Sequence, residues 1–254
     1  MRIHLGIGLL LLTTPCFSKP GKAPKNAAST VAASTAAAGT ELSALAPSTA
    51  PLTLEYISQR FAETDGKINT IKTSFRQFVR LDGSDTVQTV EGDVLFKKPD
   101  LIRLTHKIPE PQTVVSDGTY LWVHRNSTNQ VIQTKLEAWR KSEPLAQGVL
   151  DFGASADLLQ RYNTVISTVS APGPDGHRTF ELKLTPKAKT ADEFVLTLKS
   201  DTKTFFPREA ALRVGRASIR SLFENVRLNP ELPPETFKFT PPSDADLFKS
   251  PEPK

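Results

Sequence analysis

Cysteine, methionine and histidine are scarce in this 254-residue chain, and their scarcity excludes several kinds of site. The chain has one cysteine, Cys16, and one methionine, Met1. A disulfide within the chain is therefore impossible, and so is a metal site built from several cysteines. The four histidines, at positions 4, 106, 124 and 177, are at least eighteen residues apart, which excludes an HExxH motif. The chain also has no glycine-rich phosphate-binding motif.

The N-terminus has the pattern of an export signal. A basic start precedes an apolar run over 5–12, which is shorter than the about 20 residues needed to span a bilayer. We therefore interpret residues 1–18 as a secretory signal peptide, whose removal leaves no cysteine in the mature chain. Lipidation of Cys16 is an alternative, but Pro15 departs from the Leu-x-small-small pattern of bacterial lipoprotein signals.

Residues 19–51 have the composition of a flexible tether. Of these 33 residues, 23 are Ala, Ser, Thr or Pro and none is aromatic, so the segment cannot bury enough apolar surface to order itself. It carries three lysines against one glutamate, and Arg2 precedes it. Without residues 1–51, the net charge falls from +5 to +2. The remaining region, 52–254, is nearly balanced in charge, which argues against a nucleic-acid-binding domain.

Residues 52–254 are predicted to form one domain, in which a helix is followed by many short strands. Leu54, Ile57 and Phe61 lie on one helical stripe. Thr53 is a suitable N-cap, and Asp65-Gly66 is expected to end the helix. Strands are expected over 71–79, 88–98, 101–106, 113–115, 120–123, 130–136, 164–169, 179–185, 194–199, 209–214 and 218–228.

The connections between these strands favour an antiparallel arrangement. Most of them are shorter than the dozen or more residues that a parallel crossover requires. We therefore predict a mainly β fold, a strongly curved and half-open antiparallel β-barrel of about eleven strands. Two short helices, expected over 144–152 and 156–162, interrupt the strands and cover one side.

Large apolar side chains alternate with polar ones along several strands, so one face of the sheet is predicted to be apolar. Two outcomes remain open: side chains fill the interior completely, or the curved sheet keeps a cavity for an apolar ligand. The residues expected to line such a cavity are Phe75, Val94, Phe96, Ile102, Leu104, Val114, Leu121, Val123, Leu182, Leu184, Leu196 and Leu198.

Catalytic constellations are weak in this sequence. Ser116, the aspartate after it and His124 suggest a triad, but the serine lies in a predicted hairpin without a nucleophile elbow. Glu91 and Asp93 share one strand face, as an acid–base pair does, although a solvated face gives the same pattern. His106 and His124 would need carboxylate partners to bind a metal. We predict no enzymatic activity, no cofactor and no metal site, while a hydrolase using either histidine remains an alternative.

Several short motifs occur in a fixed order along the folded region. They are Phe75-x-Gln77, GDVLFKKP over 92–99, VVSDG over 114–118 followed by Leu121-Trp122, LTP over 184–186, Phe206-Pro207 and FKFTPP over 237–242. With the helical break between strands, this ordered set makes residues 52–248 resemble the periplasmic outer-membrane lipoprotein carrier family, LolA.

The resemblance implies a half-open barrel whose apolar cavity shelters lipoprotein acyl chains beneath a helical lid. It implies a monomeric periplasmic carrier that receives acylated lipoproteins from an inner-membrane ABC transporter and delivers them to an outer-membrane acceptor. Ile102 and Leu104 fall where the family has cavity-wall residues, and Leu145, Val149 and Leu150 fall in the lid.

One position departs from the family pattern. Members commonly have an arginine immediately before the proline of the second motif, reaching the lid to hold the closed state, whereas this chain has Lys98. Lysine lacks the planar fork of donors that arginine presents. Two alternatives stay open: a membrane-tethered acceptor of similar fold anchored through Cys16, and a carrier of another lipid.

Overall fold

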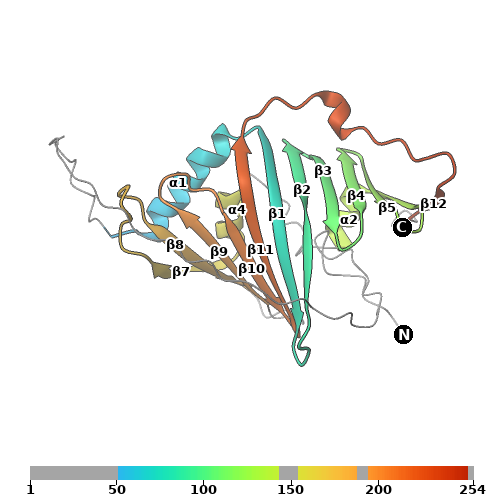
Figure 1. Cartoon of the computed structure of the whole chain (residues 1–254). Coiled ribbons are helices and arrows are strands. Elements are labelled where there is room, and N and C mark those ends of the chain that lie inside the picture. The colour runs from blue at the N-terminus through green and yellow to red at the C-terminus, as the bar shows by residue number, and fades with distance from the viewer. Residues whose placement is uncertain (1–50, 143–153, 188–193, 251–254) are drawn as a thin grey trace, which may run out of the picture.

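The strands of this protein form one curved sheet. The computed structural model describes residues 51–142, 154–187 and 194–250 (Figure 1). The expected signal peptide, the tether up to residue 50 and the helix expected over 144–152 lie outside these residues. The strands are β1 (Thr70–Leu81), β2 (Val87–Lys97), β3 (Leu101–Ile108), β4 (Gln112–Asp117), β5 (Tyr120–Arg125), β6 (Gln130–Lys135), β7 (Asn163–Val169), β8 (Thr179–Thr185), β9 (Phe194–Asp201), β10 (Glu209–Val214), β11 (Ala217–Leu228) and β12 (Asp246–Lys249).

Two antiparallel meanders make up almost the whole sheet. The strand order is β12-β6-β5-β4-β3-β2-β1-β11-β10-β9-β8-β7. Each meander, β1 to β6 and β7 to β11, pairs strands that follow one another in sequence, and the long strands β1 and β11 join the two. Only β12 pairs in parallel, with β6, among the described strands. The predicted mainly β, antiparallel fold is therefore confirmed.

Besides a short 3-10 helix in the C-terminal segment, two elements were not predicted from the sequence. The strand expected over 130–136 ends at Lys135, and Leu136 begins the helix α2 (Leu136–Ser142). The backbone N–H of Leu136 donates to the carbonyl oxygen of Thr119 at 2.9 Å, and the Leu136 side chain is buried in the core. The other unpredicted element is β12, which has four residues and an exposed burial pattern.

The C-terminal segment covers the outer face of β3 to β5. It arches away from β11 and returns beside β6 as β12 (Figure 1). The segment contains a 3-10 helix, η2 (Pro234–Phe237). Arg103 Nη1 of β3 donates to the carbonyl oxygen of Thr236 in this helix at 3.2 Å. The Phe239 ring then packs against Trp122, with their centroids 5.7 Å apart. This face of the sheet is therefore partly covered by the chain's own tail.

The N-terminal helix α1 (Leu54–Lys67) begins as predicted and ends later than predicted. Thr53 Oγ1 accepts a hydrogen bond from Tyr56 N at 3.2 Å, which confirms the N-cap. The helix continues through Asp65 and Gly66 to Lys67, so the expected end was wrong. The Asp65 carboxylate is buried and engages another helix, so it does not form the solvent-exposed turn that the Asp-Gly pair suggested.

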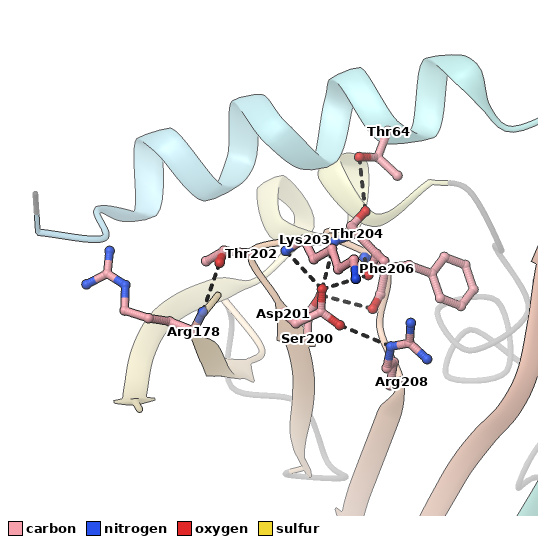
Figure 2. Close-up of polar contacts among 9 residues, drawn as sticks. All are labelled: Thr64, Arg178, Ser200, Asp201, Thr202, Lys203, Thr204, Phe206 and Arg208. Atoms are coloured by element: carbon pink, nitrogen blue, oxygen red, sulfur yellow. Dashed lines mark hydrogen bonds and ion pairs between the residues drawn. The ribbon is translucent and has the colours of Figure 1, made fainter. Parts of the chain in front are cut away.

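The turn between β9 and β10 anchors α1 (Figure 2). Asp201 Oδ1 accepts backbone N–H bonds within the turn, including one from Thr204 N at 2.7 Å, and Asp201 Oδ2 accepts from Arg208 Nε at 3.0 Å. Thr64 of α1 donates its hydroxyl to the Thr204 carbonyl oxygen at 3.4 Å. The turn gives Phe205 a positive φ of 48° and places its ring, 2% exposed, under α1.

An aromatic cluster packs α1 against the sheet. The Phe205 ring lies 6.3 Å from Phe61 and 5.8 Å from Phe180, measured between centroids. Tyr56 contacts Phe205 edge to face at 5.9 Å. Ile57 and Phe61 are fully buried, so the predicted apolar stripe is the face of α1 that meets the sheet.

Gly92 in β2 leaves space that the ring of Phe75 fills. A Cβ at position 92 would lie 2.2 Å from the Thr105 carbonyl oxygen and 2.7 Å from Phe75 Cε1. Phe75 is directly opposite Gly92 in the β1–β2 pairing. Glycine is needed here because the neighbouring strand and ring approach the backbone too closely for a side chain.

We expect Gly92→Ala to destabilise the fold by about 2 kcal/mol, as overpacking of a well-packed core does. Gly66→Ala is the matched control, because a Cβ there meets nothing within 4 Å and alanine is worth about 1 kcal/mol over glycine in a helix. Urea unfolding would measure both. If the two variants were equally stable, the close packing over Gly92 would be wrong.

Candidate functional site

The sheet has one continuous apolar face, which we call the inner face because α1 and α4 (Ser155–Arg161) pack on it. All twelve side chains predicted to line a cavity are buried, with exposed fractions of 0–6%. Eleven belong to one apolar cluster that also contains Ile57 and Phe61 of α1. Phe96 belongs to a smaller neighbouring cluster with Ile68, Ile71 and Phe206. The structure thus brings the predicted residues to one side of the sheet.

The second helix expected from the sequence, over 156–162, is present as α4 and covers part of the inner face. Ala156, Leu158 and Leu159 are buried and belong to the main apolar cluster. Helices α1 and α4 contact each other and lie beside the β7 end of the sheet (Figure 1). The predicted lid residues Leu145, Val149 and Leu150 lie outside the described residues, so their place on the inner face stays a prediction.

A buried carboxylate links the two covering helices. Asp65, near the end of α1, accepts a hydrogen bond from Ala156 N at 2.9 Å. The α4 N-cap residue, Ala154, provides no side-chain cap of its own, so Asp65 supplies the cap from another helix. Burial raises the pKa of the Asp65 carboxyl, although the Ala156 N–H and the charge of Lys98 oppose the shift.

Lys98 reaches the same junction. Its Nζ donates to the backbone carbonyl oxygen of Asp65, so it contacts the C-terminal turn of α1 from the loop after β2. The residue that the sequence singled out for its position before Pro99 therefore touches a covering helix. It makes this contact through a single donor, whereas an arginine fork could make two.

Polar side chains also occur on the inner face, and sequence reasoning missed them. Gln77 Nε2 donates to Ser221 Oγ at 3.0 Å, and Gln112 Nε2 lies 3.4 Å from His106 Nδ1. Gln77 is 0% exposed and His106 is 1% exposed. The available signal was strand alternation, since Gln77 lies two residues after Phe75 and His106 two after Leu104. Burial lowers the pKa of His106 from 6.5 to about 4, so the ring is neutral at physiological pH.

The pairing register separates the candidate catalytic and metal-binding groups. Ser116 is opposite Leu121 and His124 is opposite Thr113 in the β4–β5 ladder, so the serine and this histidine point to opposite faces. His106 faces inward and His124 outward for the same reason. Among the described residues, no three His, Cys, Asp or Glu side chains gather as a metal site.

The two carboxylates of β2 belong to a charged outer face. Glu91 Oε1 accepts from Arg76 Nε at 2.7 Å, and Asp93 Oδ2 lies 2.6 Å from Lys107 Nζ. Each carboxylate therefore has its own cationic partner, which matches the solvated-face interpretation. In the parts of the chain that the structure describes, no helix combines the length and the apolar character needed to cross a membrane.

Comparison with known proteins points to one family. Residues 66–240 match the family model described as "Outer membrane lipoprotein carrier protein LolA". An outer-membrane lipoprotein carrier protein of Albidiferax ferrireducens is 27% identical over 190 residues, 72% of this chain and 85% of the relative. One from Nitrosospira multiformis is 29% identical over 188 residues, 70% of this chain and 82% of the relative. The crystal structure of a LolA superfamily protein from Nitrosomonas europaea aligns with 14% identity and a TM-score of 0.39, covering 74% of this chain and 99% of that one.

Two variants of Asp65 separate its capping role from the cost of burying its charge. Asp65→Ala removes the acceptor for Ala156 N and should cost about 1–2 kcal/mol, as loss of a cap does. Asp65→Asn keeps an acceptor oxygen without a charge. Because the folded-state pKa is raised, stability from this group falls as pH rises through the raised pKa, so Asp65→Asn should match or exceed the wild type at pH 7. Equal stabilities of the two variants in urea unfolding would argue against the cap.

The His106 pKa predicts a pH dependence of stability. The folded-state value of about 4 lies below the ordinary 6.5, so the unfolded chain binds the proton more tightly. Stability from this group is complete above pH 6.5 and is lost as pH falls toward 4, by about 3 kcal/mol in total. His106→Gln should flatten the stability curve across this window relative to the wild type. Unchanged slopes in urea unfolding at pH 4.5, 5.5 and 7 would contradict the burial of a neutral ring.

Proposed function

Because the chain belongs to the outer membrane lipoprotein carrier family LolA, whose members are transport proteins and not enzymes, we propose that it carries acylated lipoproteins through the periplasm. It receives them from an inner-membrane ABC transporter and delivers them to an outer-membrane acceptor. The signal peptide predicted over 1–18 directs export. The observation that supports this role most directly is the continuous apolar inner face, to which both meanders contribute.

The energetics of acyl chains require such a face. Burying one methylene is worth about 0.8 kcal/mol, so exposing roughly three long acyl chains to water costs on the order of 30 kcal/mol. A protein that moves this cargo between membranes must cover most of that surface. Most of the buried inner-face side chains are aliphatic or aromatic, and hydrocarbon contacts with few fixed polar anchors suit chains of varying length.

Loading requires the cover to move. The twelve predicted inner-face side chains are 0–6% exposed, and eleven of them pack in one cluster with residues of α1 and α4. Acyl chains would take the place of contacts made by α4, whose buried residues include Leu158 and Leu159. We expect Lys98 and Asp65 to hold this covered state and the segment with Leu145, Val149 and Leu150 to complete it as a lid.

The long Ala-rich tract favours a second candidate. Residues 17–51 would serve as a leash if Cys16 were lipidated, and the protein would then be a membrane-tethered acceptor of similar fold. Mass spectrometry of the mature N-terminus decides between the two. A chain that begins near Lys19 without lipid excludes the acceptor, whereas a lipid-modified Cys16 excludes the freely diffusing carrier.

The central test uses two variants of β3, one with a carboxylate on the inner face and one with a carboxylate on the outer face. Ile102 faces inward and is 6% exposed, whereas the adjacent Leu101 faces outward and is only half-buried. Ile102→Glu should weaken binding of an acylated peptide roughly tenfold or more, because a buried carboxylate is costly to desolvate. Leu101→Glu, the matched control, should bind normally.

Binding is measured by titration of the purified mature chain with a triacylated peptide, after thermal unfolding has shown that each variant folds. Unchanged binding by Ile102→Glu would show that the inner face does not hold the cargo. Purification from the native periplasm supplies a second readout. Recovery of empty protein that acylated peptide fails to stabilise would count against carriage.

A further inference from the structure

Two polar atoms on the inner face lack a hydrogen-bond partner. Among the described residues, no donor reaches Gln77 Oε1 and no group reaches His106 Nε2, although both atoms are buried. Buried polar groups in folded proteins almost always have partners, because leaving one unpaired costs free energy. Two such atoms on one apolar face leave room for a polar ligand group that would pair with both of them.

The hydrogen bonds that these side chains do make define what each unpaired atom offers. Gln112 Nε2 can only donate, so His106 Nδ1 accepts from it and the ring proton lies on Nε2. Gln77 uses its amide nitrogen toward Ser221, which leaves its carbonyl oxygen as an acceptor. The inner face thus presents one unpaired donor, on His106, and one unpaired acceptor, on Gln77.

The sheet places this donor and this acceptor around the ring of Phe75. Gln77 follows Phe75 by two residues on β1, and the His106 ring packs edge to face on Phe75 with centroids 5.8 Å apart. On β2, the strand between β1 and β3, Gly92 lies opposite both Phe75 and His106, and Val90 lies opposite Gln77. Strands β1 and β3 flank β2, so their backbones are about 9–10 Å apart.

We propose that Gln77 and His106 form a hydrogen-bonding site for a secondary amide that attaches an acyl chain to its head group. His106 Nε2–H donates to the amide carbonyl, and Gln77 Oε1 accepts from the amide N–H. A trans amide directs these two groups to opposite sides, which suits partners on strands two apart. An ester has no donor and would leave Gln77 unpaired.

This proposal rests on the proposed function, since it names the linkage that the same inner face prefers. The experiment compares two probes with one acyl chain: N-methylhexadecanamide and methyl hexadecanoate. Each displaces a fluorescent fatty-acid analogue from the full mature protein. Because the ester forfeits the bond to Gln77 and leaves its oxygen unpaired, we expect the wild type to bind the amide roughly tenfold more tightly.

Four variants test the assignment. Gln77→Leu removes the acceptor that only the amide can use, so it should bring the two affinities within about twofold, with ester binding retained. His106→Leu removes the donor to the carbonyl that both probes share, so it should weaken both by a similar factor and leave the preference for the amide. His106→Gln keeps a side-chain donor and should restore the affinity of both probes. Thr73→Val is the matched control, because Thr73 is buried on the same face but already donates its hydroxyl to the Glu224 carbonyl oxygen at 2.9 Å.

The outcomes separate this proposal from the carrier function. Equal binding of the two probes to the wild type would overturn the amide site and leave the carrier role standing. An unchanged preference in Gln77→Leu, or unchanged affinities of both probes in His106→Leu, would also overturn it. If neither probe displaced the analogue from the wild type, the carrier role and the amide site would both fall.

Discussion

The pairing of β1 with β11 is the interaction on which the rest of the structure depends. The two strands form the seam between the meanders, from Ile71 opposite Leu228 to Leu81 opposite Ala217. Each meander alone is a smaller sheet with an apolar side that it cannot cover. Joined along this seam, they present one broad apolar face, and hydrogen bonds from Thr73 to the Glu224 carbonyl and from Gln77 to Ser221 tie the seam on that face.

A curved sheet with one apolar face must be covered, and here the cover is held by few polar contacts. The aromatic cluster around Phe205 fixes α1, and the Asp201 turn fixes Phe205, whose N–H donates to the Asp201 carbonyl oxygen at 2.9 Å. Helix α4 is tied to α1, since the carboxylate of Asp65 caps its N-terminus. The two covering helices are therefore held by different contacts, α1 by aromatic packing and α4 by a cap that α1 supplies.

Much of this architecture could be predicted from the sequence because it depends on local alternation. Apolar and polar residues alternate with a period of two, and this alternation predicted eleven strands and the inward direction of residues such as Val94 and Leu182. The late end of α1 and the role of Asp65 could not be predicted, since the partner of Asp65 lies ninety-one residues away. The separation of Ser116 from His124 needed the register of a ladder, which sequence spacing does not determine. Gln77 and His106 occupied inward positions, but only the paired sheet shows that each keeps an unpaired atom.

The covered inner face also bears on how a carrier releases its cargo. Non-covalent affinity saturates near about 20 kcal/mol, below the on the order of 30 kcal/mol that full burial of three acyl chains would provide. Part of the free energy gained by burying the chains must therefore be offset by a cost elsewhere. Breaking the buried contacts of Leu158 and Leu159 when α4 is displaced is one such cost. Under the proposed function, bound acyl chains and the displaced cover would compete for the same hydrocarbon surface. A cover that returned as the chains left would keep the inner face out of water during transfer, so release would cost less than the cargo's burial alone.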